Sequence, residues 1–364
     1  MHSISADAFS LYGALLTCPT LSDFDEAYKM GRLALRAIDR LNAFRMKPNV
    51  FLTFYGAIAH CKEPVQASIP KLLEGYEVAF ALGDMERVTG ILQLYAAVAV
   101  WGCGDKLTKA EEIIRIHFRR MLQHKQDVSC KNILPHLNQV ANLTGSKENV
   151  YVTYFNTTEE NFFEEEMNRR GAHTRKLILH TCRMYLAVMC GDMESAAREY
   201  ERNGAKYQGG IRFFGTTTRV FLAGIVGFYL ARKRRLDEKK WAQVGEISMD
   251  TIKSWTQDSS WNYAHKLLLL EAECLFLKGE EHEHIAAAKY NESIALAKKH
   301  KFKNEEGLAS QKAAMFHLEY NRKEEALSHL KHAKSCYECW GATGLARQIK
   351  IAIESLSSQS FPKI

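Results

Sequence analysis

The chain has 364 residues, of which 46% are hydrophobic and 25% are charged, a composition that is ordinary for a folded protein. Its formal net charge of +7 is spread over a chain in which acidic and basic residues alternate, so the charge does not predict a nucleic-acid partner. Nine cysteines at irregular spacings predict buried, reduced thiols and a cytoplasmic location rather than a disulfide framework.

Membrane insertion is not expected either. The N-terminus lacks the basic segment that opens a signal peptide. The longest uninterrupted apolar run, Val220 to Ala231, has twelve residues, whereas a helix needs ~20 to span a bilayer. We therefore predict a buried helix at this position and no membrane partner.

Helix is the dominant prediction along the chain. Apolar residues recur at three- and four-residue spacing, and no proline occurs between Pro135 and Pro362. A proline inside a helix costs about 3 kcal/mol, so its absence permits long helices. We predict roughly sixteen helices in two halves, residues 1–145 and 159–357, joined by a loop over 146–158 with an extended stretch at Asn149 to Phe155. A tail follows over 358–364, and a second loop interrupts the second half at 207–210.

The first well-marked helix boundary is the tetrapeptide Gly-Asp-Met-Glu at 83–86, which recurs at 191–194. Glycine ends a helix in a conformation with positive φ. The aspartate that follows caps the next helix by accepting a hydrogen bond from a free N–H group. The two copies are 108 residues apart, close to three units of about 36 residues.

Two further helical pairs follow towards the C-terminus. Leu267 to Leu277 forms a helix that ends at Gly279, and the next helix should bury Ala287, Tyr290, Ile294 and Ala297. Leu308 to Leu318 forms another helix, which a turn at 320–322 separates from Glu324 to Trp340, with a buried stripe at Ala326, Leu330, Ala333, Tyr337 and Trp340. Two-helix units of about 34–42 residues are typical of tetratricopeptide repeats. The sequence therefore predicts an all-α solenoid of tetratricopeptide-like helix–turn–helix repeats.

One dense basic run, residues 232–235 with Lys239 and Lys240 after it, directly follows the apolar stretch. We interpret it as a solvated helix end, where cations suit the helix dipole. A nuclear import signal and a patch for an acidic partner are the alternatives.

Several short motifs give the chain a resemblance to a known family. Residues 27–35 look like "GYxxGxLAL", and His60, Lys62, Glu63 and Pro64 fit "HWKEP" with Cys61 in place of tryptophan. Residues 72–76 with Gly83 and Asp84 match "LLEAYxxGLxxGDxE". Trp255, Asn262, Tyr263, His265 and Lys266 resemble "WxxxxPxNFxHKxxLxEAE", although position 260 lacks a proline, and Tyr337, Trp340 and Gly341 fit "YxxWGA".

Taken in order along the chain, these motifs resemble the helical-repeat region of multidomain signalling proteins. Those proteins join a Ser/Thr kinase-like domain and an AAA-type ATPase to the helical region, followed by a GAF domain and a histidine kinase or similar output. The resemblance implies a region that relays signals between protein domains. Motifs of the kinase, ATPase, GAF and output domains do not occur in this sequence, so their activities are not expected of it.

Catalytic motifs are also missing. A phosphate-binding loop needs a Gly-Lys-Ser/Thr ending, and no Gly-Lys dipeptide occurs. The kinase catalytic loop, the Gly-x-Ser-x-Gly elbow and the His-Glu-x-x-His zinc motif do not occur either. We expect no enzyme activity and no cofactor.

One cluster could bind metal. His329, His332, Cys336 and Cys339 follow one edge of a predicted helix, and imidazole and thiolate are natural zinc ligands. On a straight helix, positions 329 and 339 lie ~15 Å apart, so one ion could reach only two or three of them. We expect no metal here, and we interpret His60 and His265 as hydrogen-bonded packing residues.

The resulting functional hypothesis is a non-catalytic protein-interaction or signal-relay module whose partners are other domains or separate proteins. A free-standing adaptor is the alternative, and an enzyme with an unrecognised site is a third reading. A flanking coding sequence for an ATPase or GAF domain would separate the first two, and a deep pocket with converging titratable groups would favour the third.

Overall fold

The computed structural model describes residues 4–146, 173–202, 210–233 and 237–358. These residues form sixteen α-helices, labelled α1–α7 and α9–α17, with several short 3₁₀ turns and no strand among them. Consecutive helices pack against one another as hairpins along the chain. The predicted all-α repeat architecture is therefore confirmed.

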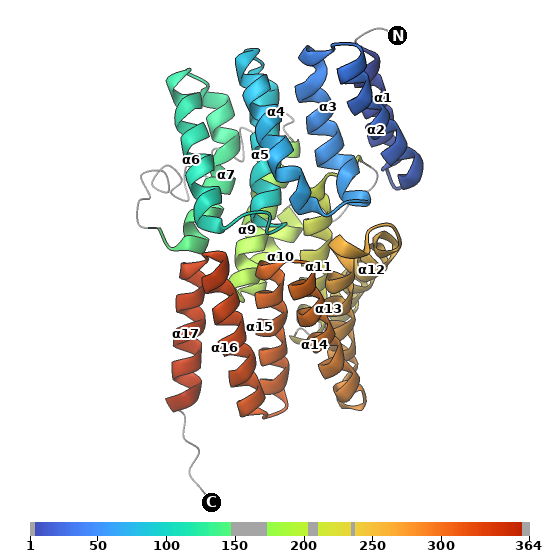
Figure 1. Ribbon diagram of the computed structural model, residues 1–364. Helices are drawn as coiled ribbons and strands as arrows, with labels where there is room; N and C mark the ends of the chain where they lie inside the picture. Colours follow the sequence, from blue (N-terminus) through green and yellow to red (C-terminus); the bar gives the residue numbers. More distant parts are fainter. Residues whose placement is uncertain (1–3, 147–172, 203–209, 234–236, 359–364) are drawn as a thin grey trace, which may run out of the picture.

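The first half contains seven helices (Figure 1). They are α1 (Ser5–Leu16), α2 (Phe24–Arg40), α3 (Lys47–Thr53), α4 (Ile69–Ala81), α5 (Met85–Val100), α6 (Leu107–Gln123) and α7 (Asp127–Thr144). A π-turn at Phe54–Ile58 and 3₁₀ turns at Ala59–Cys61 and Val65–Ser68 connect α3 to α4.

The described part of the second half contains nine helices. They are α9 (His173–Cys190), α10 (Met193–Arg202), α11 (Phe214–Lys233), α12 (Glu238–Asp258), α13 (Ser260–Lys278), α14 (Glu283–Lys299), α15 (Lys303–Glu319), α16 (Lys323–Trp340) and α17 (Thr343–Ser358). A single residue, Ser259, separates α12 from α13.

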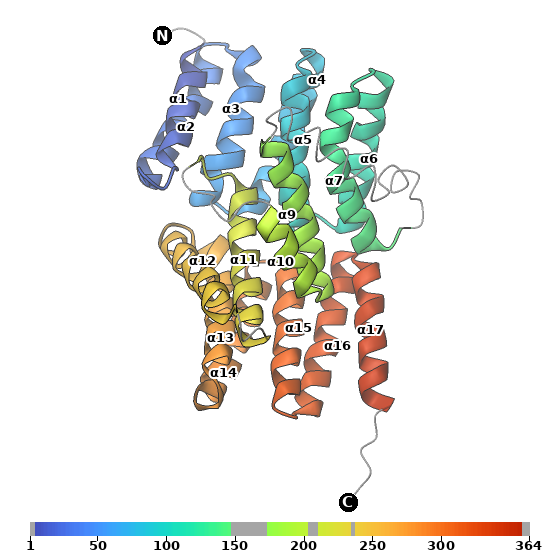
Figure 2. The same ribbon diagram turned by 180° about the vertical axis from the view of Figure 1, so that it is seen from behind.

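The helices form two tiers that stack end to end (Figures 1 and 2). We call α1–α7 the N-tier and α12–α17 the C-tier; α9–α11 lie beside both and connect them. Both tiers run in the same direction, so the end of α7 lies over the start of α17. The start of α1 and the end of α17 lie at opposite ends of the molecule.

The repeated tetrapeptide ends and starts helices as predicted. Gly83 and Gly191 have φ of +70° and +80°, which an L side chain rarely adopts. Asp84 Oδ1 accepts a hydrogen bond from Arg87 N at 3.1 Å, and Asp192 Oδ1 accepts one from Ser195 N at 3.0 Å. Local chemistry thus fixes these two turns.

The predicted core stripe of α16 is also correct, since Ala326, Leu330, Ala333, Tyr337 and Trp340 are all buried. In α14 the prediction is partly wrong. Tyr290 and Ala297 are buried, but Ala286 and Ser293 complete the stripe, while Ala287 and Ile294 are half-buried. The buried face of α14 is therefore turned by about one residue from the expected one.

Helix α11 contains the longest apolar run of the sequence. By length and composition it could cross a membrane, but 83% of its most apolar 18-residue window is buried inside the protein. Helices α5, α9, α10, α12 and α13 surround it. It is therefore the central helix of the array.

Several sequence predictions fall outside the described residues. These are the extended stretch at Asn149 to Phe155, most of the loop over 146–158, the helix start after it, most of the loop over 207–210, and the tail after Ser358. Ser146, the one described residue of the first loop, follows Gly145, which ends α7 in the left-handed conformation.

Candidate functional site

The surface where the two tiers meet contains a set of buried polar side chains, and we call this surface the junction. Its N-tier side consists of the turns at 60–68, 101–108 and 144–145. Its C-tier side consists of residues 259–266, 300–306 and 341–344. Hydrogen bonds cross the junction at three of these places: Asn262 to Val65, Asn304 to Val100 and Trp101, and Thr343 to Thr144.

His60 lies in the junction and is fully buried. Its Nε2 is 2.9 Å from the carbonyl oxygen of Arg212, which only accepts, so Nε2 carries the proton. Its Nδ1 therefore accepts from the hydroxyl of Tyr263 at 2.7 Å. Burial lowers the pKa of His60 to about 3, so the ring is neutral at ordinary pH.

Asn262 connects α13 to the turn that follows α3. Its Nδ2 donates to the carbonyl oxygens of His60 and Glu63 at 2.9 and 2.8 Å. Its Oδ1 accepts from Val65 N at 3.1 Å. One fully buried amide thereby satisfies three backbone groups of the other tier, groups that would otherwise be buried without partners.

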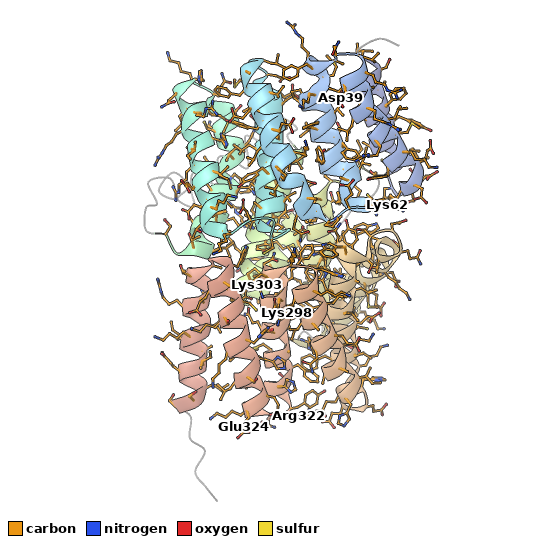
Figure 3. All side chains as sticks on the ribbon, in the orientation of Figure 1. Asp39, Lys62, Lys298, Lys303, Arg322 and Glu324 are labelled. Carbon is orange, nitrogen blue, oxygen red and sulfur yellow. The ribbon has the colours of Figure 1, made fainter. Side chains whose placement is uncertain are left out.

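Lys62 and Glu63 extend the junction to the surface (Figure 3 labels Lys62). Lys62 Nζ is 2.9 Å from Asp25 Oδ1 and 3.4 Å from Asp258 Oδ1, so it bridges α2 and α12. Burial alone would lower the pKa of Lys62, but the two carboxylates outweigh it and raise the pKa. Glu63 accepts a 2.5 Å hydrogen bond from the hydroxyl of Tyr28.

His265 and Lys266 both contact Glu305, which comes from the start of α15. His265 Nε2 lies 2.5 Å from Glu305 Oε2, and Lys266 Nζ donates to the same oxygen. Burial would raise the pKa of Glu305, but the Lys266 ammonium and the hydrogen bonds to His265 and Lys266 hold it below its ordinary value. The three side chains form a buried ionic network on the C-tier side of the junction.

The remaining motif residues are distributed more widely. Pro64 begins the 3₁₀ turn at 65–68, and Trp255 lies 5.7 Å from Tyr263, measured between ring centroids. Gly341 ends α16 in the left-handed conformation and lies against Thr108, while Trp340 is buried beside it. Gly83 and Asp84 lie in the exposed turn between α4 and α5, away from the junction.

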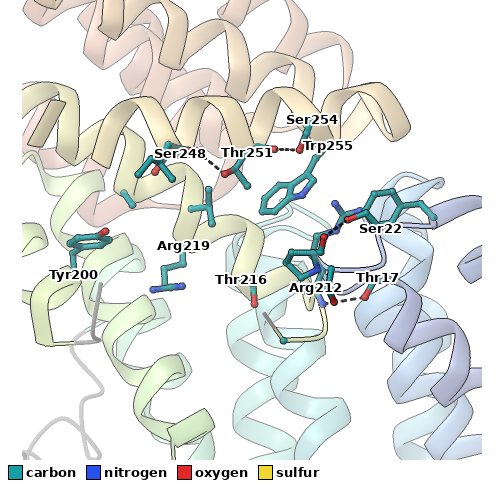
Figure 4. Close-up of a pocket in the computed structure, with 17 residues that line it drawn as sticks. Thr17, Ser22, Tyr200, Arg212, Thr216, Arg219, Ser248, Thr251, Ser254 and Trp255 are labelled. Atoms are coloured by element: carbon teal, nitrogen blue, oxygen red, sulfur yellow. Dashed lines mark hydrogen bonds between the residues drawn. The ribbon is translucent and has the colours of Figure 1, made fainter. Parts of the chain in front are cut away.

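A cavity of about 620 Å³ opens beside the junction (Figure 4). The N-tier contributes the loop after α1, and the C-terminal half contributes the start of α11 and one face of α12. Arg212 and Arg219 line it together with Trp255, Tyr200 and several Ser and Thr residues. The motif residue Trp255 thus belongs both to the junction network and to the cavity wall.

Sequence reasoning did not identify Arg212 or Arg219. One feature of the sequence could have identified Arg219, because a charged residue is unusual inside a helix that is apolar on every side. No local feature of the sequence could have identified Arg212, because its partners Thr17, Cys61 and Trp255 are distant in sequence.

The four candidate metal ligands do not come together. His332 Nε2 and Cys336 Sγ lie with a carboxylate oxygen of Glu306 within 4.8 Å of one another. His329 instead stacks on His317, with ring centroids 5.2 Å apart, and Cys339 is exposed. Lys303 (labelled in Figure 3) lies 2.5 Å from Glu306 Oε2, so a cation already neutralises this carboxylate.

The basic run after the apolar stretch is partly described. Arg232 Nη1 is 2.9 Å from Glu273 Oε2, and Lys233 Nζ is 3.0 Å from Glu319 Oε1. Lys240 pairs with Glu201 at 2.6 Å. These cations therefore pair with carboxylates of this chain, while 234–236 lie outside the described residues.

No protein-family profile matches the chain, and no curated protein matches it either. Among solved structures it is similar to a "Circular tandem repeat protein with novel repeat topology and enhanced subunit contact surfaces", at 13% identity over 98% of this chain and 95% of that one. The TM-score is 0.23, which is too low to support an argument. The fold class is established by the helices themselves, and a helical-repeat fold is the common scaffold of protein-interaction modules.

Proposed function

We propose that this chain is a non-catalytic protein-docking module in which the outer face of α1 receives an amphipathic helix of a partner protein. The observation that carries the proposal is the distribution of side chains around α1. Its small residues Ala6, Ser10, Gly13 and Ala14 face the array and are buried. Of its large apolar residues, Leu16 is buried and Phe9 packs against the core, whereas Leu11, Tyr12 and Leu15 point outward.

The outward face of α1 is apolar along its whole length. Leu11, Tyr12 and Leu15 are each about half exposed, at 49%, 52% and 50%, and Ile4 is 62% exposed. Positions 4, 11 and 15 share one side of a helix. Single exposed apolar residues are ordinary, but a continuous row on one helix is typical of an interaction surface.

The small inward face explains why the large residues point outward. A Cβ on Gly13 would lie 2.8 Å from the carbonyl oxygen of Ala27, so α1 and α2 approach too closely for larger side chains between them. A helix with small side chains on its inner face and large apolar side chains on its outer face is suited to pack between two neighbouring helices. Among the described residues, helix α1 has its neighbours in α2 and α3, on one side only.

The opposite end of the array has a different surface. Leu345, Ala346 and Ile349 of α17 are buried. Its outward residues are mostly polar or charged and include Arg347, Lys350 and Glu354, with Ile351 as an exposed apolar residue among them. Lys350 and Glu354 pair at 3.6 Å. This polar surface resembles the caps that end repeat arrays, so we assign docking to α1 and not to α17.

The test is photo-crosslinking from a benzophenone amino acid at Tyr12, in extracts of the native source, with identification of the product. We expect one specific protein product, which the double variant Leu11→Glu, Leu15→Glu removes and the control Ile351→Glu retains. Ile351 is 61% exposed on α17, so the control places the same acidic residue at a comparably exposed apolar position. A product that is unchanged in the double variant, or that is a second copy of this chain, would overturn the proposal.

Within the family that the chain resembles, this module would couple an ATPase to a downstream GAF and output domain. The positions of the motif residues support this relay role, because His60, Asn262 and Lys62 hold the two tiers together at the junction. A displacement of one tier would therefore be transmitted to the other through these contacts. The adaptor alternative keeps the same docking face, and the coding sequence around this region distinguishes the two.

The proposal includes the expectation that the chain does not hydrolyse ATP. No described residue lining the cavity beside the junction is an acid or a histidine, so that cavity offers no general base. Phosphoryl transfer also needs carboxylates that hold Mg²⁺. Purified protein with Mg²⁺ and ATP should release no phosphate above background; turnover that survives repurification and disappears on mutation of one residue would contradict the proposal.

A cytoplasmic location is part of the same proposal. All nine cysteines lie in the described residues, and all are free thiols. Secreted domains usually pair their cysteines, so this supports a reducing compartment.

A further inference from the structure

The cavity beside the junction has an unusual charge. Its lining, as far as the structure describes it, includes two arginines and no aspartate or glutamate. The other polar groups at its wall are hydroxyls, from Thr17, Thr20, Ser22, Tyr200, Thr216, Ser248, Thr251 and Ser254. The hydroxyls of Thr17, Ser22, Thr251 and Ser254 donate to backbone carbonyl oxygens of their own segments. A hydroxyl can donate as well as accept, so those of Tyr200, Thr216 and Ser248 can contact a negative charge together with the arginines.

Arg212 is the more deeply buried of the two arginines of this wall, with 3% of its surface exposed against 5% for Arg219. Its backbone N–H donates to Thr17 Oγ1 at 3.2 Å, and its Nη2 donates to Cys61 Sγ at 2.9 Å. The rings of Phe24 and Trp255 lie against the guanidinium, 3.9 and 5.0 Å from its central carbon. Figure 4 shows Arg212 beside Trp255 at one end of the cavity.

The charge of Arg212 has no counter-ion among the described residues. Its Nε and Nη1 have no hydrogen-bond partner there. Burial raises the pKa of the Cys61 thiol even though Arg212 opposes this, so the thiol is neutral. The carboxylates of Asp25 and Asp258 both pair with Lys62. A buried charge is costly unless it is paired, so Arg212 favours the binding of an anion beside it.

The cavity is large enough for a small organic ligand, since such sites typically have about 300–1,000 Å³. Apart from the hydroxyls, its walls are apolar and come from Val220, Ala223, Ile247 and the aromatic rings at the Arg212 end. An inorganic anion would leave most of this surface uncovered. A fitting ligand therefore combines a charged head with an apolar body.

We propose that this cavity binds a small organic anion, whose carboxylate or phosphate group contacts Arg212 and whose apolar body lies against Trp255, Val220 and Ile247. Arg219 adds a second positive charge to the same wall. Both halves of the chain contribute walls, so the ligand stabilises their contact when it binds. This inference does not depend on docking at α1.

The experiment is isothermal titration calorimetry of the full chain with four probes. 1-Naphthoate and 1-naphthyl phosphate carry the two candidate head groups, 1-naphthylmethanol is the neutral body, and inorganic phosphate is the bare head. We expect at least one naphthyl anion to bind about tenfold or more tightly than both the neutral alcohol and inorganic phosphate. The stronger of the two anions identifies the head group.

Two variants place the binding in this cavity. Arg212→Met should weaken the anion about tenfold or more, because it removes the buried cation. Ile247→Trp should abolish binding by filling the cavity without touching Arg212, and it protects the test if the first variant fails to fold. Ile247 is 59% exposed, and its matched control is Ile285→Trp on α14, at 53% exposure, which should bind as the wild type does.

Three results would overturn the inference: no heat from either naphthyl anion at millimolar concentration, equal binding of the neutral alcohol, or unchanged binding in Ile247→Trp. A thermal-unfolding scan with the bound anion gives an independent readout, because a ligand that binds only the folded chain raises Tm.

Discussion

The two tiers bury different kinds of side chain. Where the structure describes burial, the N-tier buries serine, threonine, glutamine and histidine as its polar residues, but no lysine, arginine, aspartate or glutamate. The C-tier buries Lys266, Glu273, Glu305, Glu306 and Lys312, all on α13 and α15. The two tiers share the helical-repeat architecture, but the core of the N-tier contains no buried charged side chain among the described residues, whereas that of the C-tier also contains ionic pairs.

This difference determines how each tier responds to substitution. An apolar contact that is removed costs its own packing, about 2–5 kcal/mol for a large side chain. A buried ion that is removed also leaves its partner charged and without compensation. The C-tier should therefore be sensitive to changes that preserve side-chain size, and the N-tier should tolerate them.

The largest effect should come from Glu305→Gln, which keeps the size of the side chain and removes its charge. Lys266 is 1% exposed and would lose its counter-ion, so we expect the free energy of unfolding to fall by about 3–5 kcal/mol. Urea denaturation measures the loss. The double variant Lys266→Met, Glu305→Met removes both charges and should recover most of it; a double variant as unstable as the single one would show that packing, not charge, is decisive.

The next effect concerns pH and tests the junction between the tiers. An unfolded histidine has a pKa near 6.5, whereas burial lowers that of His60 to about 3. Between these values the unfolded chain binds a proton that the folded chain does not, so stability falls as the pH decreases through this window. Between pH 7 and pH 5 His60 should account for a loss of about 2 kcal/mol.

His60→Gln provides the comparison, because glutamine does not titrate. The wild type should lose about 2 kcal/mol more than this variant between pH 7 and pH 5, measured by urea denaturation at each pH. Other buried histidines, such as His136 and His265, contribute equally to both proteins and cancel. Parallel pH profiles for the two proteins would show that His60 is not held neutral in the folded state.

A smaller effect on stability is expected when one tyrosine hydroxyl is removed from each tier. The hydroxyl of Tyr290 in the C-tier donates to Glu273 Oε1 at 2.8 Å, whereas that of Tyr95 in the N-tier is buried and has no partner among the described residues. Tyr290→Phe should cost about 1.5 kcal/mol, and Tyr95→Phe should change stability by less than about 0.5 kcal/mol or increase it. Equal losses in the two variants, in thermal unfolding followed by circular dichroism, would contradict the assignment of polar packing to the C-tier.

These regions also differ in how far the sequence predicts them. Helices and their ends follow from local signals, so Gly83 with Asp84 and the stripe ending at Trp340 were predicted correctly. Contacts across the junction join residues about 200 positions apart, such as His60 and Asn262 at a separation of 202. The resemblance identified both as motif residues, but no periodicity indicates that they pair.

The ionic network of the C-tier was harder still to predict. Lys266 was identified through its motif, but Glu305 and Glu306 lie in the first turn of a helix, where acidic residues are usually solvated caps. Their burial depends on the packing of α15 against the N-tier, which no local pattern encodes. Arg212 was missed for the same reason, because its environment is assembled from three distant segments.

The smallest effect concerns metal, because we expect its removal to leave the stability of the protein unchanged. Glu306, His332 and Cys336 form the one group in the described part of the C-tier whose geometry could hold an ion. Burial, reinforced by Glu306, raises the pKa of Cys336 to about 12, which favours the protonated thiol, and Lys303 supplies the positive charge beside Glu306. If the C-tier balances its buried charges internally, this group needs no metal. Purified protein should contain less than stoichiometric zinc, and EDTA should leave Tm unchanged.

One zinc per chain that is lost on Cys336→Ser, but kept on Cys339→Ser at the exposed thiol nearby, would show that the C-tier requires an external cation.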